Sequence, residues 1–467
     1  MYLLVILIVL VTKIKQKVGY ECSYPTDFLE SIMSQILSIY TYLFSRHGNH
    51  YIYNSESGFF SKISIKLYQQ LFDETLDCIY PETLNILLRH KIIVEEEEKY
   101  NYYYLTRLKF HQQCFNPQTL GLIIAPTSGC NFACPYCFEG EKETKFMDDN
   151  TIGSLIKFIN DHKQAENIHI TWYGGEPLMA FHVMKKIYER IKKETKLELL
   201  PQSIITNGYL ITNSVIDFFK NNPVNSMQIT LDGNEKHHNQ TRFLKQNHQS
   251  TYQHIIDNID KLVENIPNIN ISIRINVERD NQNDYSSLKK HLIKKYAHAN
   301  VGVYPGYIRK ETPNGEKMCY NTLFGSRMFN FYELMKCHGV KMDFLPSIAQ
   351  KGCMVHRISS YIIGPEGELY KCWNDMNHKE KIIGNILSDD LSNKSLFYRY
   401  MFETSMFEDI KCKDCLLFPV CSGGCSWLRL KNMYEGKHFD LCIMHKDRHI
   451  LEDCLIYSIE QEQIHES

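Results

Sequence analysis

Between residues 120 and 308 the chain repeats one pattern, in which a short apolar run precedes a longer stretch whose apolar side chains recur every three or four residues. That recurrence, present in 151–162, 184–195 and 251–266, is typical of a helix that buries one face. Strands that alternate with helices predict an α/β fold with a parallel sheet, either an open doubly wound sheet or a partial barrel. The runs that we expect to be strands are 120–126, 167–175, 202–208, 226–233, 270–277 and 301–308.

Chemically suggestive residues follow four of these strands. The cysteines of 130–137 come after the first strand, 174–177 after the second, Asn207 after the third and 230–233 after the fourth. Ligands of parallel α/β folds bind beyond the carboxyl ends of the strands. Because the strand pattern and the residue types are independent signals, their agreement predicts one functional site at this edge of the sheet.

The segment 41–105 has a different pattern, with short aromatic-rich runs between turn residues. Two strands are predicted around a turn at 47–49, followed by a second turn at 54–58 and then a helix. A second helix from about Pro81 runs into a final strand, with the glutamates of 95–98 as a solvent-exposed turn. Strands that flank small helices in this way are typical of a winged-helix-like module.

The composition is that of a globular protein of several domains, with 467 residues, 43% of them hydrophobic and 23% charged. A formal net charge of -2 gives no general attraction to nucleic acid or acidic lipid. The apolar run at the start lacks a basic flank and a small-residue cleavage site, and it is shorter than the ~20 residues that span a bilayer. We therefore expect a packed or interfacial extension, or an upstream misplaced start, with a membrane anchor as the alternative. The protein is expected to be a cytoplasmic monomer without a membrane or nucleic-acid partner.

Sixteen cysteines cluster along the chain, which favours metal or redox chemistry in a reducing compartment over a disulfide scaffold. Cys130, Cys134 and Cys137 are separated by three and then two residues. A 4Fe-4S cluster usually takes one thiolate on each of four irons, so three thiolates leave one iron open to a small molecule. The alternatives are a zinc site, which normally needs a second CxxC-type pair, or three buried thiols.

With Tyr136 just before its last cysteine, this CxxxCxxC loop resembles the signature of radical S-adenosylmethionine (SAM) enzymes. The resemblance implies that SAM chelates the open iron, and that one electron from the cluster cleaves SAM to a 5′-deoxyadenosyl radical, which abstracts hydrogen from the substrate. It also implies a partial (β/α)6 TIM barrel as the core and an electron donor such as ferredoxin or flavodoxin.

The stretch YGGEP at 173–177 is similar to the GGEP motif of that family. By this resemblance Gly174, Gly175 and Glu176 would receive the SAM amino group. Glycines let backbone approach a ligand closely, and a carboxylate accepts hydrogen bonds from an ammonium. A tight strand-to-helix turn with Pro177 at the first helical position explains the same residues and is compatible with that role.

Three further residues lie where similar enzymes contact the cofactor. Asn207 and Thr230 would contact the ribose and methionine parts of SAM, and Arg274 would pair with its carboxylate. The chain also has the DG, His and Arg residues at the spacing often seen in this branch, namely Asp232, Gly233, His238 and Arg242. We expect these residues to shape a loop over the cavity, and we do not expect the histidine to be a catalytic base.

A second set of cysteines follows residue 340. Its members are Cys353, Cys372, Cys412, Cys415, Cys421, Cys425 and Cys442. With four residues between Gly367 and Cys372, their spacing resembles the SPASM domain, an appendage of radical SAM enzymes that modify peptides and proteins. A zinc ribbon is the alternative, because a CxxC pair is present.

The SPASM resemblance implies two auxiliary 4Fe-4S clusters beside the SAM-binding one. The outer cluster would be held by Cys412, Cys415, Cys421 and Cys442, and the inner one by Cys353, Cys372 and Cys425. Cys337 is expected to be the fourth ligand of the inner cluster, and Cys319 or an iron open to substrate are the alternatives.

Sulfatase maturases of the SPASM group oxidise a cysteine or serine to formylglycine and carry an aspartate directly after the GxxxxC cysteine. This chain has Trp373 there, with Asp375 two residues on. KCWND together with IGN at 383–385 looks more like enzymes that act on ribosomally made peptides. The module at 41–105 resembles their peptide-recognition elements, to whose sheet edge a leader peptide could add as a strand. A structural cap is the alternative for the module.

These signals predict a peptide maturase that installs a thioether or carbon-carbon crosslink on a precursor peptide. The alternatives are an anaerobic sulfatase maturase and a non-catalytic regulator built from zinc sites and a winged helix. The predicted domains are an extension (1–40), the winged-helix-like module (41–115), the radical SAM core (116–340) and the SPASM domain (341–467).

Overall fold

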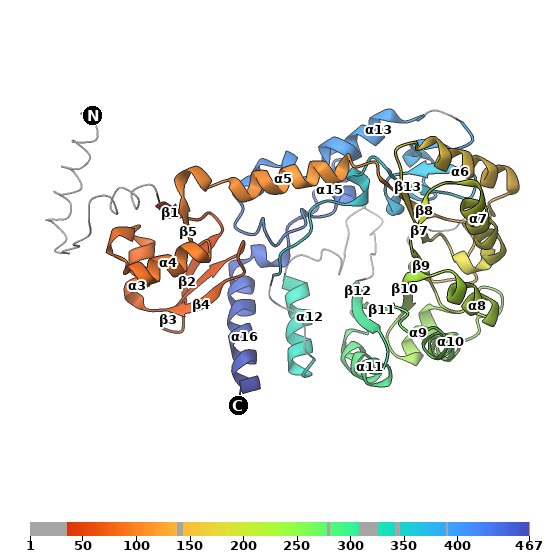
Figure 1. Cartoon of the computed structure of the whole chain (residues 1–467). Coiled ribbons are helices and arrows are strands. Elements are labelled where there is room, and N and C mark those ends of the chain that lie inside the picture. Colours follow the sequence, from red (N-terminus) through yellow and green to blue (C-terminus); the bar gives the residue numbers. More distant parts are fainter. Residues whose placement is uncertain are drawn as a thin grey trace. The chain divides into compact units, whose positions relative to one another are not determined.

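The computed structural model describes residues 35–137, 143–277, 281–307, 326–340, 346–388 and 391–466 (Figure 1). The chain forms two compact units. The small unit comprises Met1–Arg107, Leu345–Gln350 and Ile410–Cys421, and the large unit comprises Leu108–Phe344, Lys351–Asp409 and Ser422–Ser467. The predictions for residues 1–34 and for Cys319 concern residues outside the described part of the chain.

A parallel sheet organises the large unit. Its strands in chain order are β6 (Thr119–Ile124), β7 (Asn167–Trp172), β9 (Gln202–Thr206), β10 (Val224–Leu231), β11 (Ile271–Val277) and β12 (Val301–Tyr307). Each pairs in parallel with the next, which confirms the predicted strands. Among the described strands β12 pairs with β11 alone, so the sheet stays open at this side.

A helix follows each of these strands. The helices are α6 (Asp149–Asp161), α7 (Phe181–Glu194), α8 (Asn213–Asn221), α10 (Tyr252–Asn265), α11 (Gln282–Lys295) and α12 (Ser326–Cys337), with the short α9 (Glu235–Thr241) before α10. Figure 1 shows α6, α7, α8 and α10 along the outer face of the sheet. This repeated strand-helix order is that of a partial barrel.

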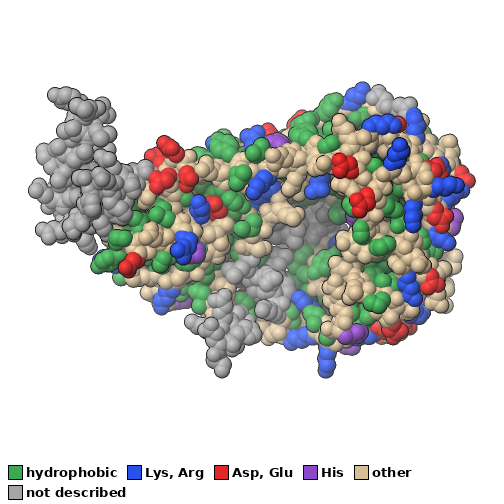
Figure 2. Space-filling view, viewed as in Figure 1, with side chains coloured by type: hydrophobic (Ala, Val, Ile, Leu, Met, Phe, Trp, Pro, Cys, Tyr) green, Lys and Arg blue, Asp and Glu red, His purple; other side chains and the backbone are tan. Residues whose placement is uncertain are grey.

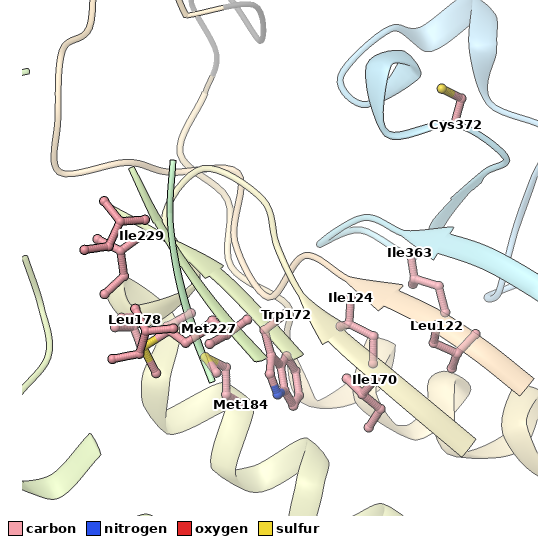
Figure 3. Packing of buried hydrophobic residues seen from close by; sticks show 14 of the residues in the cluster. Leu122, Ile124, Ile170, Trp172, Leu178, Met184, Met227, Ile229, Ile363 and Cys372 are labelled. Atoms are coloured by element: carbon pink, nitrogen blue, oxygen red, sulfur yellow. The ribbon is translucent and has the colours of Figure 1, made fainter. Parts of the chain in front are cut away.

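The main core lies between the sheet and these helices (Figure 3). Alternate side chains of the strands β6 to β11 face the helices and are buried, such as Leu122 and Ile124 of β6 and Ile170 and Trp172 of β7. Burial of one such side chain contributes roughly 1.5 to 3 kcal/mol. The opposite face of the strands carries the polar residues of the candidate site.

The small unit contains two short sheets. One is the antiparallel β2 (Thr41–Arg46), β3 (Asn49–Asn54) and β4 (Phe60–Ile63), and the other pairs β1 (Gln35–Leu37) with β5 (Ile93–Glu95). The predicted hairpin is confirmed, and its two-residue turn has positive φ at His47 (51°) and Gly48 (75°), as such hairpins require. The pattern missed β4, because its four residues follow the second turn directly. Two helices complete the unit, α3 (Ile65–Phe72) and α4 (Pro81–Arg89).

The final strand predicted for this module is present as the short β5, but its expected continuation to about residue 105 was wrong. This stretch begins α5 (Asn101–Cys114), after a single exposed 3-10 turn at Glu96–Glu98. Consecutive tyrosines favour strands by propensity, but the helix lets Tyr102 and Tyr103 pack on Phe418 within the small unit. Tertiary contacts therefore decided the conformation, whereas the exposed turn of glutamates was as expected.

After α12 the alternation stops, as the sequence indicated. The remaining elements of the large unit are β13 (Ser360–Ile363), β14 (Glu368–Tyr370), β15 (Gly384–Asn385), α13 (Lys394–Tyr398), α15 (Ser426–Tyr434) and α16 (Arg448–Glu466), with β8 (Glu198–Leu199) beside β7. The sequence did not reveal that β13 joins the main sheet, parallel to β6. α14 (Ile410–Lys413) belongs to the small unit.

Two surface properties bear on the expected partners. Figure 2 shows Lys and Arg side chains interspersed with Asp and Glu on the face in view. Among the described residues, no helix is both long and apolar enough to cross a membrane.

Candidate active site

A cavity of about 300 Å³ lies at the carboxyl ends of the parallel strands in the large unit. Every residue that the sequence assigned to the first cluster or to SAM lines it. These residues are Cys130, Cys134, Tyr136, Cys137, Gly174, Gly175, Glu176, Asn207, Thr230 and Arg274. The structure therefore brings together residues that are up to 144 positions apart in sequence, from Cys130 to Arg274, while their individual roles stay predictions.

The cysteine loop is fixed where it leaves β6. Thr127 Oγ1 donates to the carbonyl of Lys145 at 2.6 Å, and Ser128 Oγ donates to the carbonyl of Glu143 at 2.7 Å. Further along, the backbone N–H of Ala133 donates to the carbonyl of Phe243 at 3.2 Å. The loop thus holds its thiols in place through backbone contacts on both sides.

The thiols of this loop differ in exposure, with Cys130 and Cys134 half-buried and Cys137 exposed. Burial raises the pKa of Cys130 to about 11, and the neighbouring Glu176 carboxylate adds to the rise. Burial also raises the pKa of Cys134, although the charge of Arg242 opposes the effect. Thiolates in such surroundings need a nearby positive charge, which a bound iron-sulfur cluster would supply.

The two glycines of the YGGEP stretch are required by the cysteine loop. A Cβ on Gly174, whose φ is +114°, would lie 2.5 Å from the carbonyl oxygen of Thr127. A Cβ on Gly175 would lie 2.1 Å from the carbonyl oxygen of Gly129. The close approach that these glycines permit is therefore between two protein backbones, in addition to any approach of a ligand.

Glu176 is fully buried, and three protein groups donate to its carboxylate. Oε1 accepts from Thr206 Oγ1 at 2.7 Å and from the N–H of Leu178 at 3.0 Å, while Oε2 accepts from the N–H of Asn207 at 2.7 Å. Burial still raises its pKa, against these hydrogen bonds. The predicted tight strand-to-helix turn is thus present, and Glu176 caps the 3-10 helix that begins at Pro177.

Asn207 ties the third strand to the cysteine loop. Its Nδ2 donates to Asn131 Oδ1 at 2.8 Å, and its Oδ1 accepts from the N–H of Tyr209 at 2.9 Å. Thr230 lines the cavity from β10, and Arg274 lines it from β11. The contact of Asn207 with SAM stays a prediction, and the structure adds a positioning role for its side chain.

A buried polar network lies beside the loop. Tyr136 Oη donates to the Asp232 carboxylate, which also accepts from Thr241 Oγ1 at 2.8 Å and from Asn276 Nδ2 at 3.0 Å. Arg242 Nη1 donates to Tyr136 Oη at 3.1 Å. This network fixes the aromatic residue that precedes Cys137.

Arg242 lines the cavity. The sequence did not predict this position, because its motif indicated only that Arg242 shapes the loop. The DG, His, Arg spacing was the available signal. His238 has the structural role that was expected, since its ring nitrogens lie 3.2 Å from the Asp232 N–H nitrogen and 3.1 Å from Thr251 Oγ1. Burial holds the pKa of His238 well below its ordinary value.

The second cysteine set is divided between the units. Cys353, Cys372, Cys425 and Cys442 lie in the large unit, and Cys412, Cys415 and Cys421 lie in the small unit. Burial raises the pKa of Cys372 well above its ordinary value, and the charges of Asp375, Cys425 and Cys353 add to the rise. The three thiols assigned to the inner cluster are therefore neighbours.

Cys337 is exposed at the end of α12. Its assignment to the inner cluster stays a prediction. No three His, Cys, Asp or Glu side chains of the described ranges converge as ligands of a single ion would. A 4Fe-4S cluster takes its thiolates on separate irons, so its ligands do not meet at one point.

The residues after Cys372 form one wall of the cavity. Trp373 and Asn374 line it, and the Trp373 ring lies 6.1 Å from that of Tyr173. Asp375 is buried elsewhere, where its carboxylate accepts from Tyr400 Oη at 2.6 Å and from Trp427 Nε1 at 2.9 Å. Asp375 is thus absent from the cavity lining among the described residues.

Residues 124–288 match the model of the radical SAM superfamily. The chain is a radical SAM enzyme. It is 26% identical to the cysteine-type anaerobic sulfatase-maturating enzyme of Clostridium novyi, over 68% of this chain and 91% of that one. It is 31% identical to the serine-type enzyme of Bacteroides thetaiotaomicron over 24% of this chain and 29% of that one.

The fold of this radical SAM enzyme matches a solved structure described as "Native anSMEcpe with bound AdoMet and Cp18Cys peptide". The match has a TM-score of 0.53 at 19% identity and covers 73% of this chain and 97% of that one. The family implies a 4Fe-4S cluster and SAM, and the three thiols beside one cavity fit that cluster. The non-catalytic regulator is thereby set aside.

Proposed function

We propose that this enzyme modifies a ribosomally made precursor peptide, installing a thioether or carbon-carbon crosslink. When bound, the cluster and SAM would supply a 5′-deoxyadenosyl radical that takes one hydrogen atom from the peptide, and the second electron released by crosslinking would pass to a proposed auxiliary cluster, with loss of a proton. The observation that supports this most is the single cavity that gathers the cysteine loop, the YGGEP turn and the strand-end residues. The peptide present in the related solved structure supports a peptide as the substrate class.

The residues of this chain would act by binding, orientation and exclusion of water. Cys130, Cys134 and Cys137 would hold the SAM-binding cluster. Glu176 keeps the YGGEP turn in place through its three hydrogen bonds, so that Gly174 and Gly175 present their backbone to the cavity. The aromatic wall of Trp373 and Tyr173 would keep water from the reacting carbon.

A sulfatase maturase is the second candidate, because several curated relatives are sulfatase-maturating enzymes and one is matched over 91% of its length. Two features disfavour it. Trp373 stands where that branch carries an aspartate, and Asp375 is buried between Tyr400 and Trp427. The test is whether the purified enzyme, with SAM and reductant, oxidises a peptide with a sulfatase motif.

Two auxiliary clusters belong to this proposal. Their proposed ligands are Cys412, Cys415, Cys421 and Cys442 for the outer cluster, and Cys353, Cys372, Cys425 and Cys337 for the inner one. The mutual charge effects among the first three inner thiols support the inner group. An electron donor such as ferredoxin or flavodoxin would reduce the enzyme.

The small unit would recognise the leader part of the peptide. Its three-stranded sheet has edges at β2 and β4, and a peptide strand can add to either edge through main-chain hydrogen bonds. A structural cap is the alternative. Deleting residues 41–100 should weaken binding of a full precursor peptide if the unit recognises it, and a cap would leave that affinity unchanged in the folded remainder.

The deciding experiment replaces Cys130, Cys134 and Cys137 with alanine and measures iron, acid-labile sulfide and 5′-deoxyadenosine after anaerobic reconstitution. We expect no 5′-deoxyadenosine and retention of the auxiliary iron. Cys78→Ala, which removes a thiol outside all proposed ligand sets, is the matched control. Retained SAM cleavage in the triple variant would contradict the role proposed for the loop.

A further inference from the structure

Asn374 connects the cavity to a thiol outside it. Cys372 is buried and is absent from the described part of the cavity lining, whereas Asn374 belongs to that lining. Asn374 Nδ2 donates to Cys372 Sγ at 3.6 Å. Cys372 is one of the ligands proposed above for the inner auxiliary cluster, so a role of this hydrogen bond at the cluster rests on the proposed function.

A single 3-10 turn begins after Cys372 and carries Asn374. Asp375 closes the turn, because its N–H donates to the carbonyl of Cys372 at 3.0 Å. The buried Asp375 carboxylate accepts from Tyr400 Oη at 2.6 Å and from Trp427 Nε1 at 2.9 Å. Buried contacts on the next residue therefore hold the Asn374 amide beside the sulfur.

The segment after Cys353 joins the three thiols proposed for the inner cluster. Lys371 Nζ donates to two backbone carbonyls of this segment, at 2.6 Å and 2.7 Å, and Cys372 is the next residue after the lysine. His356 Nε2, in the same segment, lies 2.9 Å from the hydroxyl oxygen of the serine that follows Cys425. Direct bonds thus hold the three stretches of chain together, as ligands of one cluster require.

A hydrogen bond to a cysteine ligand changes how readily an iron-sulfur cluster takes up an electron. Reduction makes the cluster more negative, and a donor directed at its sulfur stabilises that added charge, which raises the reduction potential. Burial acts in the opposite direction, because surroundings of low polarity disfavour added charge. The Asn374 amide therefore offsets part of the effect of burial at Cys372.

We infer that Asn374 is a positioning residue for electron transfer, which raises the potential of the inner cluster through the Cys372 sulfur and so makes this cluster the acceptor of the electron released at the cavity. In the proposed reaction the peptide radical, which has already lost one hydrogen atom, bonds to a second residue of the peptide. Forming that bond releases one electron, which reduces the oxidised cluster, and one proton, which passes to water. Removing the donor makes the cluster a weaker acceptor.

The test compares the reduction potentials of the auxiliary clusters in reconstituted full-length variants, followed by electron paramagnetic resonance during a redox titration. The auxiliary signals are those that added SAM leaves unchanged. Asn374→Leu keeps the approximate size of the side chain and removes the donor. We expect the ratio of reduced to oxidised inner cluster at a fixed potential to fall about tenfold, which equals about 59 mV for one electron. The outer cluster should keep its potential.

Asn374→Asp separates this effect from a loss of packing, because aspartate has the shape of asparagine. At about pH 8 its carboxylate is ionised and repels the added electron, so the inner potential should lie below that of Asn374→Leu. This variant also carries the test alone if Asn374→Leu does not load its cluster.

Gln228→Leu is the matched control. It removes another amide from the same cavity, one whose Oε1 accepts from Tyr304 Oη at 2.6 Å. Both auxiliary potentials should stay unchanged in this variant.

An unchanged inner potential in Asn374→Leu would overturn the inference, as would an equal shift in Gln228→Leu. Equal shifts in Asn374→Leu and Asn374→Asp would also count against it, because lost packing then explains both. Failure of the proposed ligand set has a different signature. Cys372→Ala would then keep all of its iron and both auxiliary potentials.

Discussion

Replacing Gly175 with alanine tests how the YGGEP turn holds the cysteine loop. The new Cβ would lie 2.1 Å from the Gly129 carbonyl oxygen and 2.5 Å from that of Ser128, about 1 Å inside any normal contact. The Gly129 carbonyl accepts from the N–H of Glu176 at 2.8 Å, so moving it also breaks a buried hydrogen bond. Overpacking costs about 1 to 3 kcal/mol and the lost hydrogen bond about 1 kcal/mol.

We therefore expect Gly175→Ala to lower the free energy of unfolding by about 2 to 4 kcal/mol in urea titrations of the cluster-free protein. The SAM-binding cluster should also be lost selectively, because Cys130 follows the displaced Gly129. Iron content and the SAM-induced change in the spectrum of the reduced cluster measure this second effect.

Gly153→Ala is the matched control for Gly175→Ala. Gly153 lies within α6, and the nearest atom to its added Cβ among the described residues is Arg190 Nη1 at 3.9 Å. Glycine costs about 0.5 to 1 kcal/mol relative to alanine inside a helix, so this variant should gain stability and keep its iron. Unchanged stability and iron content in Gly175→Ala would refute the packing argument.

Three other changes test single features. His238→Gln tests how the stability of the protein depends on pH. Burial holds the pKa of His238 well below 6.5, so the unfolded chain binds a proton before the folded chain does as the pH falls. Stability present above about pH 6.5 is then lost below it, by up to about 1.4 kcal/mol per pH unit, and urea titrations from pH 7.5 to 5 should show a shallower loss in the variant. Asp375→Asn leaves Tyr400 or Trp427 facing an amide N–H, and should cost about 1 to 3 kcal/mol of unfolding free energy in the same assay, with no loss as the contrary result. Cys425→Ala should reduce product formation more than SAM cleavage, and an equal loss of both, followed by mass spectrometry, would count against an auxiliary role.

The sequence predicted the parallel strands because each one repeats the same apolar run between helices, a signal that depends on local pattern alone. It failed at α5, where Tyr102 and Tyr103 favour a strand by propensity but pack as a helix on Phe418. It also missed β13, whose pairing with β6 joins residues more than 230 positions apart. No local pattern carries such a pairing.

The sequence predicted only part of the site, because the contacts that hold it together also join loops that are distant in sequence. Motif spacing found the thiols and the YGGEP stretch, but not what holds them. That Glu176 accepts from Thr206 and Asn207, and that Gly175 makes room for Gly129, depends on which loops meet in space. The motif spacing identified Arg242 but predicted only that it shapes the loop, because spacing does not show which side chains of a loop face the cavity.

The wall after Cys372 bears on the choice between the two candidate reactions. Oxidation of a cysteine or serine to formylglycine requires a group that accepts a proton from the reacting residue. At this wall the chain presents Trp373 and Asn374, while Asp375 already accepts hydrogen bonds from Tyr400 and Trp427. Because the described side chains at this wall include no carboxylate, the wall lacks the acid that a formylglycine-forming maturase carries directly after this cysteine.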